Sequence, residues 1–271
     1  MIYWCKRFEM RLSIFLIIVC LTITNGYAQE KKTEIIDSSS GSIEIYLQKP
    51  NKEKFPFLLF LHGASTDLGI VSISQDWFDH WIDKGYAVGA ISMPGFGSTS
   101  GIRDFCGPVT IQTLHFAIDT ILKRLEVSDL GIIGFGQGGL AAILLSLGRD
   151  DIKYITSING SYDLQRHLHT DDILIRGIQA RNYALPLNEK EFEIRSPRAF
   201  VSLIKTPIFI LHREDNPIVN TDEVMSFVEA MRHLNKECAY AMMKKTPESD
   251  VQKLSFDEII EETEDWMDTH L

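Results

Sequence analysis

The sequence is poor in cysteine and in positive charge. Its 271 residues include 4 cysteines, with no CxxC pair and no Cys/His spacing typical of zinc, so we expect no metal and no cofactor. Asp and Glu outnumber Lys and Arg by 37 to 27, which gives a net charge of −10. Nucleic-acid binding needs a basic surface, and this composition argues against it.

Long apolar runs are also scarce, and the most continuous one lies near the N-terminus. Lys6, Arg7 and Arg11 precede the apolar stretch Leu12–Ile23, which is too short to span a bilayer, and small residues follow it up to Ala28. This pattern predicts a signal peptide over residues 1–28 and a secreted or periplasmic protein with no membrane span after cleavage.

Two other interpretations of this segment are possible. It would act as a membrane anchor if it were not cleaved, or as a lipoprotein signal if Cys20 were lipidated, although Val19 is a poor match to the residue expected there. Cleavage would leave Cys106 and Cys238. An oxidising compartment permits a bridge between them, but we favour two small buried thiols.

The remaining chain alternates between strand and helix patterns. Residues 29–41 are polar and predict a flexible lead-in, and about 230 residues then suffice for one domain, 42–271. Apolar patterns predict strands at 42–48, 56–61, 87–92, 130–133, 154–158, 207–211 and 238–243, and helices at 75–84, 111–125, 138–147, 221–234 and 254–270. This alternation indicates an α/β fold with a mostly parallel sheet and flanking helices. Residues 161–205 interrupt it and predict a small cap over the strands' carboxyl ends.

The most informative segment is the glycine-rich turn within residues 130–140. It has the glycine frame of a nucleophile elbow, G-x-S-x-G-G, and we place Gln137 at the position of the serine. A carboxamide has no proton that a histidine can remove at neutral pH, and its nitrogen is delocalised into the carbonyl. This interpretation predicts an elbow without a nucleophile.

Four motifs in order resemble the α/β-hydrolase superfamily, and most closely the prolyl-oligopeptidase-like serine peptidases and related esterases. They are an HG pair after a strand (59–63), a P-x-G-x-G-x-S segment (94–101), the elbow (134–139) and the approach to an acid-bearing turn (196–212). The resemblance covers the chain from about residue 42 to its end. It implies an α/β-hydrolase fold and, in the family, a Ser-His-Asp triad.

The resemblance also implies that this triad is degenerate. The family's acid position falls on Asn216, and Asp215 would serve only with a shift of one residue; Asn cannot supply the negative charge that stabilises an imidazolium. The family's histidine follows the last strand, but residues 243–250 contain none, and His270 next to the C-terminus is the only one downstream.

The frame of the site is expected to survive. By the resemblance, amides near Ala64 or Ser65, together with that of Gly138, would form the oxyanion-type nest. Gln137 would either extend its carboxamide toward a ligand there or lie idle over a filled pocket. Both alternatives stay open at this stage.

Other reactive side chains are most simply structural. His62 is expected to support its loop from the core. His167, His169, Asp171 and Asp172 have a loose spacing that makes a metal site on the cap the weaker alternative. The same structural interpretation applies to Ser98, Ser100, Cys106, Trp77 and Trp81.

We therefore expect an exported hydrolase-like protein that has lost acyl-transfer chemistry and binds a small molecule, a peptide or a protein partner through the old cleft. The alternatives are a working peptidase or esterase with an unconventional site, and a structural or interaction subunit. An enzyme requires a histidine and a carboxylate that converge on a nucleophile. A binder requires a lined pocket beside the elbow.

Overall fold

A computed structural model describes residues 33–64, 67–167, 188–243 and 256–269. The predicted signal peptide, Ser65 and His270 lie outside these residues. So do the three cap residues His169, Asp171 and Asp172. In the part described, no helix is both long enough and apolar enough to cross a bilayer.

Eight strands form one sheet in the order β1-β2-β4-β3-β5-β6-β7-β8. Their bounds are β1 (Thr33–Ser38), β2 (Gly41–Gln48), β3 (Phe55–Leu61), β4 (Ala87–Ile91), β5 (Val127–Phe135), β6 (Ile152–Ile158), β7 (Ile208–Arg213) and β8 (Cys238–Met243). β1 and β2 are antiparallel to their neighbours, and the pairs from β4 to β8 are parallel. The predicted α/β class with a mostly parallel sheet is confirmed.

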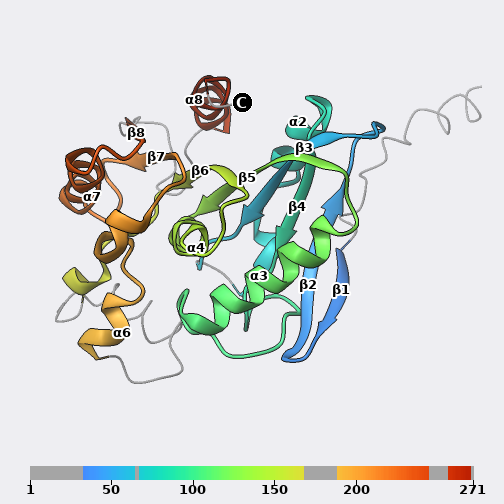
Figure 1. Ribbon diagram of the computed structural model, residues 1–271, viewed down its shortest axis with the longest axis horizontal. Helices are drawn as coiled ribbons and strands as arrows, with labels where there is room; N and C mark the ends of the chain where they lie inside the picture. Colours follow the sequence, from blue (N-terminus) through green and yellow to red (C-terminus); the bar gives the residue numbers. More distant parts are fainter. Residues whose placement is uncertain (1–32, 65–66, 168–187, 244–255, 270–271) are drawn as a thin grey trace, which may run out of the picture. The chain divides into compact units, whose positions relative to one another are not determined.

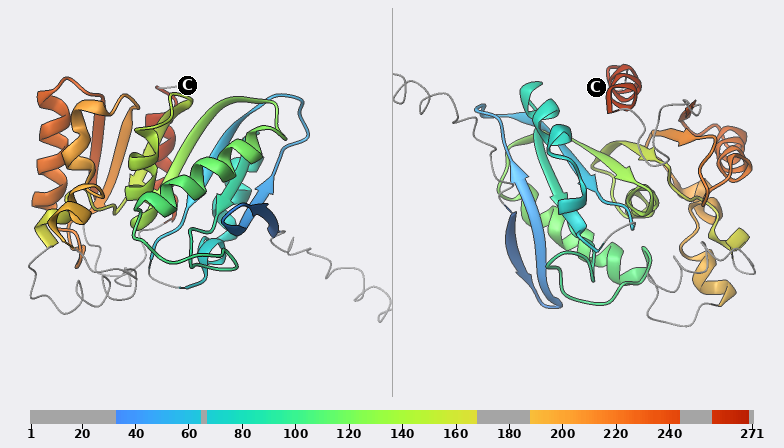
Figure 2. Two further views of the ribbon diagram at one scale, coloured as in Figure 1. Left: turned by 60° about the horizontal axis from the view of Figure 1, so that its bottom comes forward. Right: turned by 180° about the vertical axis from the view of Figure 1, so that it is seen from behind.

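Helices cover both faces of the sheet (Figures 1 and 2). They are α2 (Gln75–Asp83), α3 (Pro108–Leu122), α4 (Gln137–Ser146), α6 (Glu189–Glu193), α7 (Thr221–His233) and α8 (Phe256–Met267), with short 3-10 turns η1 (Gly69–Ser72), η2 (Leu164–His167) and η3 (Pro197–Leu203). Apolar side chains of α3, α4 and α7 pack in one core cluster, and those of α2 and α8 in a second.

Strand β3 explains why the sheet has two cores. Its side chains alternate between the faces, as a pleated strand requires. Phe57, Leu59 and Leu61 join the cluster beneath α3 and α4, whereas Leu58 and Phe60 join the cluster beneath α2 and α8. Because both faces are buried, the strand reads as a continuous apolar run.

The lead-in prediction for residues 29–41 is wrong from Thr33 onward, because Thr33–Ser38 forms the edge strand β1. An edge strand with one open side keeps polar residues, and only Ile36 among the six is buried. That composition resembles a loop. The helix and strand predictions from residue 42 agree with the structure to within a few residues at each end.

Candidate functional site

The chain turns sharply between β5 and α4, and the strained residue of this turn is Gly136. Its backbone has φ 52° and ψ −111°, outside the regions that side chains favour. The amide of Gly136 donates to the carbonyl of Ile158 on β6 (2.7 Å), and its carbonyl accepts from Gly139 and Leu140. These bonds fix the corner above the carboxyl ends of the strands.

The placement of Gln137 at the nucleophile position is therefore wrong by one residue. In a nucleophile elbow, the strained residue carries the nucleophile, and Gly134-x-Gly136-x-Gly138 puts that position at Gly136. A Cβ built on Gly136 would meet nothing closer than the Cα of Gly63, at 3.9 Å. The elbow thus has space for a side chain and carries none.

Gln137 is the first residue of α4, and 7% of its surface is exposed. Its Oε1 is buried and has no hydrogen-bond partner, while its backbone carbonyl accepts from the Cys106 thiol (3.3 Å). Since the residue after the nucleophile supplies an amide to an oxyanion hole, the corresponding amide here belongs to Gln137. The oxyanion-type amide that we predicted at Gly138 is therefore assigned to Gln137, one residue earlier.

Gly134 and Gly138 let α4 approach the sheet. A Cβ on Gly138 would lie 2.1 Å from the carbonyl oxygen of Leu61, and a Cβ on Gly134 would lie 2.4 Å from the Gly138 backbone. Ala64, the other nest residue that the structure describes, is half-buried and follows Gly63, the residue nearest to the elbow. The first loop and the elbow therefore meet at the expected place.

His62 supports this first loop from the core, as predicted. Its ring is fully buried; Nε2 accepts from the amide of Met93 (3.0 Å), and Nδ1 donates to the carbonyl of Gly63 (2.8 Å). Burial lowers the pKa of His62 to about 4, so the ring is neutral at physiological pH.

The neighbouring loop, 94–101, is held by Glu44, a buried carboxylate that the sequence did not single out. Glu44 accepts from the Ser92 hydroxyl (2.6 Å) and from the amide of Ser98 (3.2 Å). Ser100 bonds to Ser42 through their hydroxyls (2.8 Å). Ser100 thus has the structural role predicted for it, whereas the bond described for Ser98 comes from its backbone amide.

Cys106 lies beside the elbow but is poorly suited to be a nucleophile. It is 1% exposed, and burial raises the pKa of its thiol well above the ordinary value, so the reactive thiolate is disfavoured. Cys106 and Cys238 are both free thiols, which agrees with the interpretation that we favoured over a bridge.

At the acid-bearing turn after β7, Asn216 caps the backbone. Its Oδ1 accepts from the amides of Ile218 (2.9 Å) and Val219 (3.1 Å). Asp215 makes a two-pronged ion pair with Arg213, with Nε and Nη2 of the arginine 3.0 and 2.9 Å from its two oxygens. Asp215, the alternative acid one residue away, is thus engaged in a structural ion pair. Asn216, at the acid position of the family, has no charge.

Among the described residues, His62 adjoins Gly63 beside the elbow, but both of its ring nitrogens are bonded to backbone groups. The predicted location of the base falls within residues 244–255, outside the described part, and the sequence has no histidine between His233 and His270. Within the described residues, the ion pair between a histidine and a carboxylate is His80–Glu264, between α2 and α8.

Arg195, which sequence reasoning also missed, bonds the segment predicted as a cap to the loop before α3. Arg195 is 2% exposed; its Nε donates to the carbonyl of Asp104 (2.8 Å), and Nη1 donates to the carbonyl of Glu191 (2.9 Å). The Asp104 carboxylate in turn accepts from the amide of Val109 (2.7 Å) at the start of α3. No sequence pattern distinguishes a buried arginine from a surface one.

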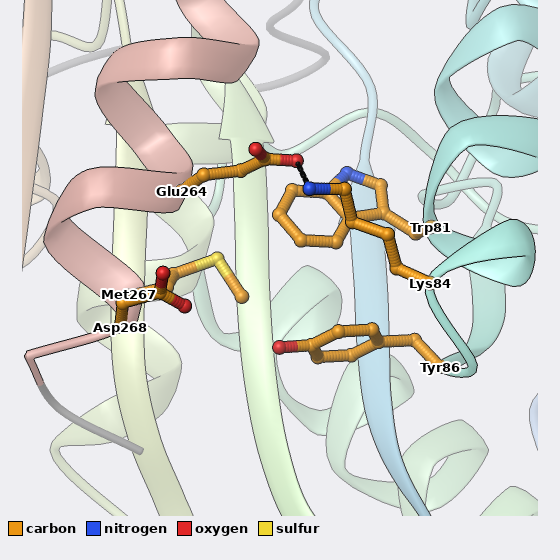
Figure 3. Close-up of a pocket in the computed structure, with 6 residues that line it drawn as sticks. All are labelled: Trp81, Lys84, Tyr86, Glu264, Met267 and Asp268. Atoms are coloured by element: carbon orange, nitrogen blue, oxygen red, sulfur yellow. Dashed lines mark ion pairs between the residues drawn. The ribbon is translucent and has the colours of Figure 1, made fainter.

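Two cavities among the described residues lie away from Gly136. One, of about 320 Å³, lies between α2 and α8 (Figure 3), and the other, of about 440 Å³, lies at the amino ends of β5 and β6. The described part contains no group of His, Cys, Asp or Glu that could hold a metal. The two tryptophans Trp77 and Trp81 are buried in the core, as predicted.

No family model matches the sequence, and no curated protein matches it as a relative. Solved structures do. A Pyrococcus horikoshii acylaminoacyl peptidase is 21% identical with a TM-score of 0.67 and covers 79% of this chain and 36% of its own. An acylaminoacyl peptidase complexed with Z-Gly-Gly-Phe-chloromethyl ketone is 20% identical with a TM-score of 0.72 and covers 88% and 40%.

The esterase Est1E from Butyrivibrio proteoclasticus is 18% identical with a TM-score of 0.68 and covers 88% of this chain and 98% of its own. The chain thus spans about two-fifths of the length of the acylaminoacyl peptidases and nearly all of the esterase. At these identities, the likeness concerns architecture. The chain has the α/β-hydrolase fold in the form found in prolyl-oligopeptidase-like peptidases and esterases.

Proposed function

We propose that this chain is an exported α/β-hydrolase-fold protein that has lost acyl-transfer catalysis and binds a ligand at the elbow. The observation that carries this proposal is Gly136. The residue with the strained elbow geometry, where the fold holds its nucleophile, has no side chain.

The loss extends beyond the nucleophile. Asn216 replaces the acid, Asp215 is engaged with Arg213, and the sequence after β8 has no histidine before His270. Triad members act as a unit, and removal of one costs roughly 10⁴- to 10⁶-fold in kcat. An oxyanion hole and binding alone leave roughly 10³- to 10⁴-fold acceleration over water, which is too little for useful turnover.

The elements that would hold a ligand are retained. The Gln137 amide begins α4 at the corner, Gly63 lies against this corner, and Glu44 and His62 hold the surrounding loops. A nest of backbone amides favours a carboxylate or a carbonyl oxygen. The space at Gly136, which a serine hydroxyl fills in an enzyme, leaves room for a second ligand oxygen.

The acyl products of this fold's usual reactions are therefore the ligands to test first. We expect a carboxylate such as N-acetylphenylalanine to raise the melting temperature of the purified protein in a saturable manner, and the corresponding amide to do so less. Gly136→Ser fills the space with a hydroxymethyl group and should reduce the response. An unchanged melting temperature with the carboxylates, or an equal response in Gly136→Ser, would rule out this mode of binding.

Export is part of the same proposal and rests on the N-terminal pattern of Lys6, Arg7, Arg11 and the apolar run up to Ile23. The mature chain is expected to begin after Ala28. Mass spectrometry of the protein recovered from the periplasm or medium would test the cleavage site. Recovery of the uncleaved chain in membranes would favour the anchored alternative.

A further inference from the structure

Residues 104–107 form a short strap between the segment that contains α6 and the elbow. At one end of the strap, the Arg195 guanidinium donates through Nε to the carbonyl of Asp104 (2.8 Å). At the other end, the Cys106 thiol donates to the carbonyl of Gln137 (3.3 Å), the first residue of α4. The strap therefore bonds both to the α6 segment and to the turn that carries the elbow.

The α6 segment, residues 188–196, fits closely against the strap. Arg195 is 2% exposed, and its guanidinium also bonds to the carbonyl and the carboxylate of Glu191 in α6. A Cβ on Gly107 would lie 2.2 Å from Nη2 of Arg195, so only a glycine in the strap admits the guanidinium. Phe192 of α6 is 2% exposed and belongs to the same core cluster as the cysteine of the strap. A shift of the α6 segment would therefore displace the strap.

The backbone in the middle of the strap is strained. Phe105 has φ 50° and Cys106 has φ 61°, in the left-handed region that disfavours residues with a Cβ. The other non-glycine residues with positive φ in the described part are Asn159 and Asn235, and asparagine tolerates this conformation best. Strain of this kind persists only where the surrounding structure imposes it, and it is concentrated at functional and switch regions.

The start of the strap can turn but cannot translate freely. The Asp104 carboxylate accepts from the amides of Val109 (2.7 Å) and Thr110 (3.2 Å), which fixes this side chain at the first turn of α3. The Asp104 carbonyl that Arg195 holds belongs to the peptide unit shared with Phe105. A displacement of the guanidinium would therefore rotate this peptide unit and change the strained φ of Phe105.

The other end of the strap holds the first turn of α4. The Gln137 carbonyl that accepts from the Cys106 thiol directly follows Gly136, whose own carbonyl accepts from the amides of Gly139 (3.0 Å) and Leu140 (3.2 Å). Rotation within the strap would move the thiol away from this carbonyl. The first turn of α4 would then lose a bond that ties it to the strap.

We infer that the strap transmits the position of the α6 segment to the elbow, so that the two loosen or tighten together. The coupling is reciprocal, because each end of the strap constrains the other. It is a property of the folded chain and does not depend on ligand binding at the elbow. A ligand that tightens the elbow would, by the same linkage, tighten the α6 segment.

Hydrogen exchange of the purified protein, read by mass spectrometry, tests this inference. Arg195→Gln removes the guanidinium that holds the strap. We expect exchange to accelerate at least about tenfold in α6 and also at the elbow amides of Gly136, Gly139 and Leu140. Amides of α2, on the other face of the sheet, should stay within about twofold of the wild type.

The reciprocal variant perturbs the elbow end. Cys106→Ala removes the donor to Gln137 and leaves every group of Arg195 and α6 in place, so it tests the inference even if Arg195→Gln does not fold. We expect it to accelerate exchange in α6 by at least about fivefold. Cys106→Ser keeps a donor at this position and should bring the α6 rates back toward those of the wild type.

Arg149→Gln is the control, because Arg149 is another largely buried arginine. It pairs with Asp119 and Asp151 beyond the C-terminal end of α4, and its loss should leave elbow exchange within about twofold. The inference would be overturned by unchanged elbow rates in Arg195→Gln, by unchanged α6 rates in Cys106→Ala, or by a rise in Arg195→Gln that includes α2 equally. Equal elbow rates in Arg149→Gln and Arg195→Gln would overturn it as well.

Discussion

At the scale of single residues, buried carboxylates hold the loops at the carboxyl ends of the strands. Glu44 fixes loop 94–101, and Glu223, in the first turn of α7, fixes the loop after β6. Glu223 is 1% exposed and accepts from the Ser161 hydroxyl (2.6 Å) and from the amides of Tyr162 (2.8 Å) and Asp163 (3.1 Å). Its carboxylate completes the hydrogen bonds of that turn.

Glu223→Gln should therefore destabilise the protein by about 1–3 kcal/mol, since a neutral amide replaces a charged acceptor of three hydrogen bonds. Urea unfolding at pH 7 gives the change in unfolding free energy. Glu229→Gln, on the exposed side of the same helix, is the control and should stay within about 0.5 kcal/mol. Equal effects of the two variants would show that the Glu223 contacts contribute little.

His62 makes stability depend on pH. Its pKa is about 4 in the folded protein, because burial disfavours the charged ring, against about 6.5 when unfolded. Below pH 6.5 the unfolded state takes up the proton first, so the stabilisation is complete above that pH and decreases as the pH falls toward 4. For a shift of this size, the loss is about 3 kcal/mol.

Burial also lowers the pKa values of His212 and His115, and both act in the same direction. Unfolding free energies measured between pH 7 and pH 4 should therefore fall. His62→Gln keeps a donor and an acceptor but does not titrate, and it should reduce the slope; the exposed His233→Gln should not. Identical slopes in both variants would remove His62 as a source of the pH dependence.

At the scale of elements, the close approach of α4 to the sheet fixes the elbow. Gly138 has no room for a Cβ, because Leu61 O would lie 2.1 Å away, whereas Gly136 has the room but an unfavourable φ. Lack of space thus excludes a side chain at Gly138, whereas the backbone conformation disfavours one at Gly136.

This difference predicts unequal costs for the same substitution. Gly138→Ala should destabilise the protein by more than about 3 kcal/mol or prevent folding, because backbone atoms of β3 would have to move. Gly136→Ala should cost about 1–2 kcal/mol, the penalty for a Cβ at positive φ. Circular dichroism melting of the two variants compares them. A larger loss in Gly136→Ala would contradict the packing described for α4.

At the scale of the whole molecule, the buried elements were predictable, whereas the polar edge strand β1 was not. The parallel strands read as apolar runs because both of their faces are buried, and the helices read from their apolar stripes. β1 could not be predicted in this way, since an edge strand with one buried residue among six has the composition of a loop. The burial of Arg195 and Glu223 could not be predicted from the sequence, because it depends on partners that are distant along the chain.

The elbow shows where a sequence pattern is ambiguous. Residues 134–139 contain four glycines, and a repeated glycine frame fits the motif in more than one register. The backbone geometry identifies Gly136 as the strained residue, and Gln137 becomes the first helical residue with a buried side chain. The conclusion that the elbow has no nucleophile holds in either register, but its physical basis changes from a wrong side chain to an absent one.

Hydrolysis of fluorogenic esters and peptides by the purified wild type, beside Gly136→Ser, tests whether the elbow has lost acyl transfer. We predict no turnover above blank by either protein, because His62, next to the elbow, has both ring nitrogens bonded to backbone groups and Asn216 carries no charge. Turnover by the wild type that copurifies with the folded chain, or efficient turnover gained by Gly136→Ser alone, would contradict this account.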